Sequence, residues 1–258
     1  MIKQEIHYFF TALMFFTRIP CPSWTKYRAE YLHKSRKYFP VIGWIVGGFS
    51  ALVFWLAVHM FPLSIAVVLS VIGGVLLTGA FHEDGFSDVC DGFGGGYSKD
   101  QILTIMKDSR IGVYGAIGML LLVLLKLYAL YEIAEIDLYL LLITLINAHC
   151  SSRFIASTFV QSHDYVQDPD RSKAKPIASL RLTKAEMMFS FLLTLLPLLL
   201  FPHWIFILPL LVGYLAKIYL GYYFKKNIGG YTGDCLGATQ QIAEVLFYLT
   251  VVAICRLS

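Results

Sequence analysis

The chain is poor in charged residues. Asp, Glu, Lys and Arg make up 15% of its 258 residues, whereas a soluble domain carries about a quarter. The mean hydropathy is +0.66 and 57% of the residues are hydrophobic. Several apolar runs approach or exceed the roughly 20 residues that cross a bilayer. The composition therefore excludes an ordinary soluble domain. It predicts an all-α, polytopic integral membrane helix bundle with the lipid bilayer as its surroundings.

We expect about seven transmembrane helices, forming a single membrane-embedded domain over residues 1–258. The candidate spans are Tyr38–Phe61, Pro62–Phe81, Ile111–Tyr131, Leu138–Val160, Met187–Phe201, Trp204–Phe224 and Leu236–Arg256. The fifth is short and contains Pro197, so it is expected to be tilted, kinked or merged with its neighbour. A further apolar run, Ile6–Pro20, is too short to span alone and predicts an N-terminal interfacial or re-entrant helix.

Basic residues are absent from alternate connections between these spans, namely Pro62–Ser64, Glu132–Asp137 and Pro202–His203. The other segments, Cys21–Lys37, His82–Arg110, Gln161–Glu186 and Lys225–Cys235, hold 5, 3, 5 and 2 Lys or Arg. The positive-inside rule places these four segments in the cytoplasm, so the chain is expected in the plasma (inner) membrane. This distribution accounts for the net charge of +4, and no nucleic-acid partner is predicted.

Paired-cysteine motifs are also missing. The five cysteines show no CxxC spacing, and they lie in spans or on the cytoplasmic side, so we expect them to be reduced and unpaired. The sequence does not fix the oligomeric state, and a homo-oligomer is compatible with it.

Negative charge is concentrated in one stretch, "HEDGFSDVCDGFGGG", directly after the second apolar run. If the helix continues past Phe81, then Asp84, Asp88 and Asp91 stand at i, i+4 and i+7 on one face. Like charges so spaced repel one another, and a carboxylate at membrane depth costs about 3 kcal/mol. A divalent cation offsets both effects, and Mg²⁺ is commonly held by one or two carboxylates together with phosphate oxygens.

Glycines and further polar residues accompany the acidic stretch. Gly85 and Gly92 follow each other at i and i+7 beside the acids, and we expect them to leave the backbone open to a bulky ligand. Asn147, Arg153 and Glu244 lie inside spans, where facing lipid is costly, so they are expected to line the bundle interior.

Basic residues near the acidic stretch complete a candidate diphosphate site. Lys107 and Arg110 precede the third span, and Lys173 and Lys175 lie in a cytoplasmic segment. Carboxylates that bind Mg²⁺ opposite Lys and Arg suit a diphosphate substrate. The residues alone therefore predict a membrane-embedded, Mg²⁺-dependent transferase that cleaves a diphosphate.

The blocks "HEDGFSDVCDGFGGG", "IMKDSRIGVYG" and "GGYTGDCLGA" resemble those of cobalamin synthase, the adenosylcobinamide-GDP ribazoletransferase family. "FFTRIPCP" and "FPVIGWIVGG" resemble its opening segments, so the similarity runs through essentially the whole chain. It implies an enzyme that transfers the cobinamide phosphoryl group of adenosylcobinamide-GDP to α-ribazole, or to α-ribazole 5′-phosphate. The products would be adenosylcobalamin or its 5′-phosphate, and GMP, with Mg²⁺ as cofactor.

The resemblance also suggests roles for individual residues. Asp91, or less favourably His82, would accept a proton. Lys107, Arg110, Arg153, Lys173 and Lys175 would bind substrate. The candidate metal ligands are Glu83, Asp84, Asp88, Asp108 and Asp234.

Three rival interpretations share part of this pattern. A UbiA-type membrane prenyltransferase would use a second acidic motif, for which Asp164 and Asp168 are available, but the usual Asn before the first motif is missing. A CDP-alcohol phosphotransferase would continue with Ala-Arg, which is absent here. A divalent-cation transporter would carry its carboxylates near mid-span, whereas here only Glu244 lies inside a span.

Overall fold

The computed structural model describes residues 2–25, 28–166 and 180–257, and these residues fold almost entirely as helices. None of them forms a β-strand beyond one isolated bridge between Tyr165 and Tyr231. The α-helices are α1 Ile2–Phe16, α2 Leu32–Ser35, α3 Phe39–Val58, α4 Leu63–Thr78, α5 Phe81–Gly95, α6 Lys99–Ile105, α7 Val113–Ile136, α8 Leu138–Ser157, α9 Phe159–Ser162, α11 Lys184–Leu195, α12 Leu208–Ile228 and α13 Gly233–Leu257. Short 3-10 turns are η1 Ala29–Tyr31, η2 Arg36–Tyr38, η4 Leu196–Leu200 and η5 Trp204–Ile207. The all-α class predicted from the sequence is confirmed.

Fewer helices than predicted are long enough to cross a membrane. Within the described ranges, five qualify by length and hydropathy: Leu32–Val58, Val113–Ile136, Leu138–Ser162, Trp204–Ile228 and Gly233–Leu257. The pair α4 and α5 adds a sixth only if it is counted as one broken span. The expected fifth span is instead the 12-residue α11, which passes into the 3-10 turn η4 at Pro197. The described residues thus give a multi-pass membrane protein with five or six candidate spans, and the expected number of about seven is not confirmed.

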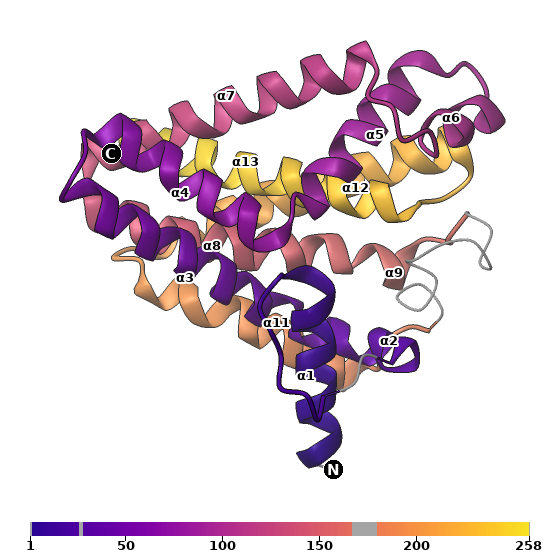
Figure 1. The fold of residues 1–258 in the computed structure, drawn as a ribbon, viewed down its shortest axis with the longest axis horizontal. Helices are drawn as coiled ribbons and strands as arrows, with labels where there is room; N and C mark the ends of the chain where they lie inside the picture. Colours follow the sequence, from indigo (N-terminus) through magenta and orange to yellow (C-terminus); the bar gives the residue numbers. More distant parts are fainter. Residues whose placement is uncertain (1, 26–27, 167–179, 258) are drawn as a thin grey trace.

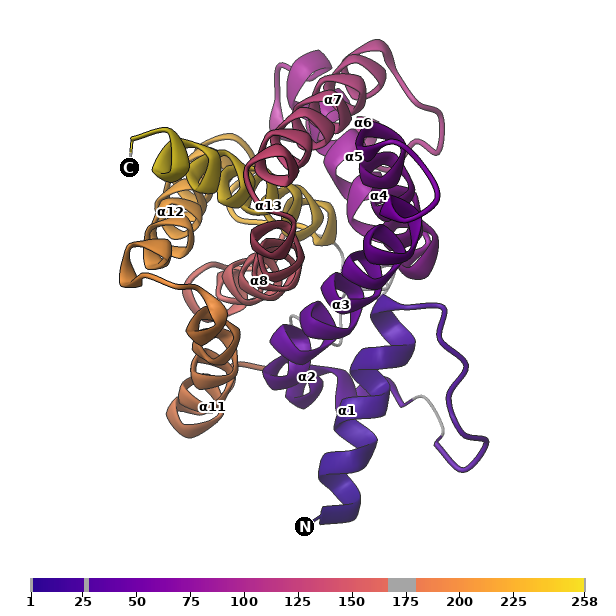
Figure 2. The same ribbon diagram turned by 90° about the vertical axis from the view of Figure 1, so that its left-hand side faces the viewer.

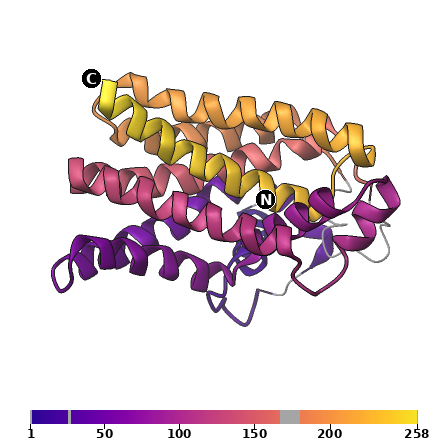
Figure 3. The same cartoon turned by 90° about the horizontal axis from the view of Figure 1, so that it is seen from above.

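Helix α8 is the centre of the bundle. In an apolar stretch of 18 residues of its span Leu138–Ser162, 72% of the residues are buried. The corresponding share is 28% for α7 and 33% for the span that contains α12. Figure 2 shows α8 surrounded by α3, α11, α12 and α13, and all four contact it. Figure 3 shows α4, α7, α13 and α12 side by side in this order. The outer helices expose large apolar side chains such as Leu56, Leu121 and Leu215, as expected of helices that face lipid.

Glycine allows α3 and α8 to approach closely. A Cβ on Gly43 would lie 2.4 Å from the carbonyl oxygen of His149, and one on Gly47 would lie 2.6 Å from that of Leu145. Any side chain at these two positions would push the helices apart.

A sharp bend separates α4 from α5. The two helix axes differ by 91°, and the residues between them, Gly79 and Ala80, both have left-handed backbone angles, with φ of 68° and 58°. Glycine is the usual residue for such a helix end, whereas alanine there costs about 1–2 kcal/mol. The predicted helix over the acidic stretch is therefore present, but it starts anew after the bend instead of continuing α4.

The chain connections lie at two opposite ends of the bundle. Figure 1 shows α5, α6, α9 and the turn between α12 and α13 at one end. The α3–α4 and α7–α8 connections and the C-terminus lie at the other end. The basic side chains of Lys99, Lys107, Arg110, Lys225 and Lys226 thus belong to the end that carries the acidic helix.

Candidate functional site

The acidic residues of α5 form a graded series from solvent to interior. Asp84 is exposed, Asp88 is half-buried and Asp91 is buried. All three lie on one helix, at the spacing predicted from the sequence. Asp88 feels the negative charges of Asp234, Asp84 and Asp91, and Asp234 in turn feels that of Asp84. Asp84, Asp88 and Asp234 are therefore neighbours, although Asp234 comes from a distant part of the chain.

Close backbone packing brings Asp234 to the acidic helix. Asp234 lies in the first turn of α13, and a Cβ on Gly85 of α5 would stand 3.0 Å from its Cα atom. A Cβ on Gly237 would likewise stand 3.4 Å from the Cα atom of Gly85. These glycines let α5 and α13 touch, so the carboxylates on either side of Gly85 stand beside that of Asp234. The expectation that Gly85 leaves space for a ligand was wrong, and so was that for Gly92, which packs on Met106.

Asp91 anchors the start of α7. The backbone N–H of Gly112 donates to its Oδ2 at 2.7 Å, and that of Gly115 donates to its Oδ1 at 2.8 Å. These N–H groups have no partner within α7 because they belong to the helix N-terminus, where a negative charge is favourable. A Cβ on Gly115 would stand 2.3 Å from Oδ2 of Asp91. The carboxylate thus fastens α5 to α7, a contact that the sequence spacing did not reveal.

Lys107, Asp108 and Arg110 lie together on the exposed loop between α6 and α7. The Arg110 guanidinium donates from Nη2 to Asp108 Oδ2 at 2.7 Å and from Nε to both carboxylate oxygens. These hydrogen bonds lower the pKa of Asp108 to about 2. Asp108 is therefore ionised at neutral pH and already paired with a cation. The predicted substrate ligands Lys173 and Lys175 lie outside the described residues.

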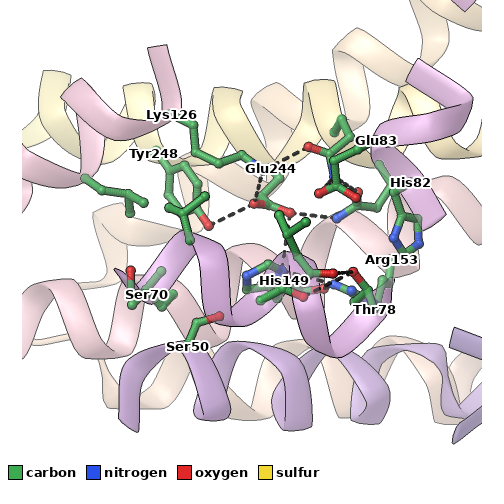
Figure 4. A pocket seen from close by; sticks show the side chains of 17 residues that line it. Ser50, Ser70, Thr78, His82, Glu83, Lys126, His149, Arg153, Glu244 and Tyr248 are labelled. Carbon is green, nitrogen blue, oxygen red and sulfur yellow. Dashed lines mark hydrogen bonds and ion pairs between the residues drawn. The ribbon is translucent and has the colours of Figure 1, made fainter. Parts of the chain in front are cut away.

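Three of the predicted site residues face the bundle interior instead of the acidic surface. His82, Glu83 and Arg153 line a small cavity between α3, α4, α5, α7, α8 and α13, with room for about one water molecule. The His82 ring is buried and stacks on Phe16 with 5.5 Å between ring centroids. Arg153 donates from Nη1 to the carbonyl oxygen of His149 at 3.0 Å. Figure 4 shows these side chains converging on the cavity.

A buried ionic network centred on Glu244 fills the rest of this region. Lys126 of α7 lies 2.8 Å from Glu244 Oε1, and His149 of α8 lies 3.2 Å from Oε2. Gln240 donates to Oε2 at 2.7 Å and Tyr248 donates to Oε1 at 3.1 Å. Every oxygen of the buried carboxylate thus has a partner, as a charge in a low-dielectric interior requires.

The interior positions of Asn147, Arg153 and Glu244 were predicted from the sequence and are confirmed, since all three are at most 2% exposed. The partners Lys126 and His149 were missed. Their signal was a polar side chain inside a candidate span, where facing lipid is costly, the same signal that identified the other three.

The donor chemistry at this end of the bundle suits a hard cation. Asp84, Asp88 and Asp234 bring only carboxylate oxygens, which Mg²⁺ prefers. Among the described residues, no group of three or more His, Cys, Asp or Glu side chains stands close enough to enclose a metal ion. A Mg²⁺ ion needs only one or two carboxylates when substrate phosphates supply further oxygens, so the residues fit an ion that binds with its substrate.

Comparisons with known proteins agree with the resemblance seen in the sequence blocks. A sequence model of the family described as cobalamin-5-phosphate synthase matches residues 8–252. An adenosylcobinamide-GDP ribazoletransferase from Shewanella frigidimarina is 44% identical over 252 residues, covering 97% of this chain and 96% of the relative. Proteins with the same description from Shewanella piezotolerans and Shewanella oneidensis are 43% and 40% identical, with 95% of each relative covered. No solved structure matches the chain. These matches do not favour the three rival interpretations, namely a UbiA-type prenyltransferase, a CDP-alcohol phosphotransferase and a divalent-cation transporter.

Proposed function

The chain belongs to the cobalamin-5-phosphate synthase family, and on this premise we propose that it is an adenosylcobinamide-GDP ribazoletransferase. It joins the cobinamide phosphoryl group of adenosylcobinamide-GDP to α-ribazole, or to α-ribazole 5′-phosphate, and releases GMP. The observation that carries the proposal is the near-complete match to relatives described by this activity, on a chain whose acidic helix lies at the end of a membrane bundle.

The acidic surface of α5 and α13 is the proposed reaction site. One or two of the carboxylates of Asp84, Asp88 and Asp234 would hold Mg²⁺ together with substrate phosphate oxygens, and the ion would supply positive charge to the diphosphate when bound. The mutual repulsion of these carboxylates supports the assignment, because nothing within the group itself offsets it. Glu83 is not included, since its side chain faces the interior cavity.

The reaction requires one bond to form and one to break at the same phosphorus atom. A hydroxyl oxygen of α-ribazole bonds to the phosphorus on the cobinamide side, and the bond to the oxygen of GMP breaks with its electron pair. Lys107 and Arg110, which are exposed on the neighbouring loop, would bind the phosphates and stabilise the charge on GMP. The hydroxyl proton would pass to a carboxylate. Asp91 is the candidate that the resemblance implies, although it is buried and both of its oxygens accept backbone N–H groups.

We also propose that the acidic end of the bundle faces the cytoplasm. The support is the positive-inside rule: the four longer connecting segments contain Lys and Arg, whereas the three alternate connections contain none. A cytoplasmic site receives a water-soluble, nucleotide-linked substrate directly.

The test is an assay with purified membranes containing the protein, supplied with adenosylcobinamide-GDP, α-ribazole and Mg²⁺. Formation of adenosylcobalamin and GMP in equal amounts is expected, and it should stop when EDTA removes the metal. Membranes carrying Asp88→Asn are the matched control. No product from wild-type membranes that contain folded protein would refute the proposal.

A further inference from the structure

Gln241 is the residue that ties the acidic helix to the buried network. Its Nε2 donates to Oε1 of Glu83, in the first turn of α5, at 3.0 Å. Its Oε1 accepts from Nζ of Lys126 on α7 at 2.9 Å. Its Nε2 also donates to Oε1 of the neighbouring Gln240 at 2.8 Å. One buried amide of α13 therefore links α5 to α7 through both of its polar atoms.

The carboxylate of Glu83 has one hydrogen-bond partner among the described side chains, the amide of Gln241. The other carboxylate oxygen, Oε2, is buried and has no hydrogen-bond partner in the described part of the chain. A buried carboxylate oxygen without a partner is costly, so the side chain depends on Gln241 for its direct stabilisation. The backbone next to Glu83 carries Asp84, and any movement of one moves the other.

The rotation of α5 about its own axis depends on such side contacts. The left-handed residues Gly79 and Ala80 interrupt the helix, so α4 does not impose its rotation on α5. Contacts with neighbouring elements fix it instead, among them the Glu83–Gln241 bond, the stacking of His82 on Phe16, the packing of Gly85 on Gly237 and the bonds of Asp91 to the start of α7. The glycine contact has no polar direction. At the first turn, the Glu83–Gln241 bond is the side-chain hydrogen bond that joins α5 to α13, and it acts beside the stacking of His82 on Phe16.

We propose that Gln241 is a positioning residue for the reaction site: its bond to Glu83 sets the rotation at which Asp84 and Asp88 face Asp234. The role rests on the proposed function, because it concerns the same acidic surface. Gln241 itself is buried and touches no substrate. It acts through Glu83 and the backbone of α5.

The experiment exchanges the two partners and follows α5 directly. Gln241→Glu sets two carboxylates against each other, Glu83→Gln removes the anion, and the double exchange restores an amide–carboxylate pair with reversed polarity. Cys90, half-buried on α5 against Gly118 of α7, reports the rotation through its rate of modification by a membrane-permeant maleimide. Chains that retain only Cys90 or only the buried Cys150 are used, the latter reporting general loosening.

Each single variant should speed Cys90 modification about fivefold with Cys150 unchanged, and should lower turnover about tenfold. The double exchange should return both values to within about twofold of wild type. The control is Arg256→Gln, which breaks the 2.6 Å ion pair with Glu132 that joins α7 and α13 far from α5. It should change neither value.

Three results would overturn the positioning role: unchanged Cys90 rates in the single variants, equal acceleration of Cys90 and Cys150, or a double exchange no better than the singles. A failure of the proposed function is seen separately, as absence of adenosylcobalamin with the wild-type chain. In that event the labelling rates would still decide whether Gln241 sets the rotation of α5.

Discussion

The carboxylate of Asp91 on α5 accepts the backbone N–H of Gly115 on α7 at 2.8 Å. Together with the bond from Gly112, this contact gives Asp91 a structural role: it holds the start of α7 against α5. This role is independent of whether Asp91 also accepts the proton of the substrate hydroxyl. Loss of a helix cap lowers the stability of the fold, whereas loss of a proton acceptor lowers only the turnover. Measurements of unfolding therefore distinguish the two roles of Asp91.

Asp91→Asn should destabilise the protein. The variant keeps the size of the side chain but loses the negative charge and one acceptor at the start of α7, which should cost about 1–3 kcal/mol. Thermal unfolding in detergent measures the effect, with Asp100→Asn on the exposed start of α6 as the control. Lost turnover with an unchanged unfolding midpoint would instead assign Asp91 to proton acceptance alone.

Asp88→Asn should abolish transfer without destabilising the fold. Removing one of several repelling carboxylates relieves repulsion, whereas an unneutralised diphosphate is a poor electrophile, so turnover should fall by several orders of magnitude. Raising Mg²⁺ should rescue little. Asp88→Glu should fail too, since an added methylene displaces an ion that demands near-octahedral geometry. Near-normal turnover of Asp88→Asn would mean that the acidic surface is only a solvated helix end.

Arg110→Ala should lower kcat/KM at least about tenfold, equivalent to about 1.4 kcal/mol of transition-state stabilisation. Arg110 lies on the loop that joins α6 to α7 at the acidic end of the bundle. The matched control is Lys184→Ala at the exposed start of α11, which should stay within about twofold of wild type. Equal losses in both variants would show that these side chains act through general surface charge.

The orientation proposal predicts the sidedness of cysteine labelling. In a chain without its native cysteines, Ser98→Cys and Lys226→Cys should react with an impermeant reagent from the cytoplasmic side of inverted vesicles. His203→Cys, at the opposite end of the bundle, should react only from the other side. Opposite sidedness of Ser98→Cys and Lys226→Cys would contradict the topology.

The ion pair that docks α1 predicts a dependence on pH. Glu5 accepts from Lys37 and from Tyr38, each at 2.7 Å. Burial raises the pKa of Glu5, but these hydrogen bonds outweigh it and leave the pKa below its usual value. The stabilisation is therefore present above the unfolded-state pKa of about 4.3 and is lost as the pH falls through the folded-state value. Wild type should unfold at higher temperature than Glu5→Gln at pH 7, and the difference should vanish in acid. A difference that persists in acid would point to packing instead.

Sequence patterns predicted the positions of residues on individual helices better than the contacts between helices. Periodicity identified the acidic face of α5, and the cost of burying charge identified the interior positions of Arg153 and Glu244. Neither argument reveals the bend, because an alanine with positive φ is set by tertiary packing and not by a local preference. The approach of Asp234 to Asp88 likewise depends on contact between helices distant in sequence. The expected number of about seven spans is not confirmed, because α4 and α11 have only 16 and 12 residues.

The right angle between α4 and α5 fixes the depth at which the carboxylates lie. If α4 runs along the bilayer normal, α5 runs along the membrane plane, and Asp84, Asp88 and Asp91 share one level instead of descending into the lipid. Substrate then approaches sideways over a flat platform, and no part of it has to enter hydrocarbon.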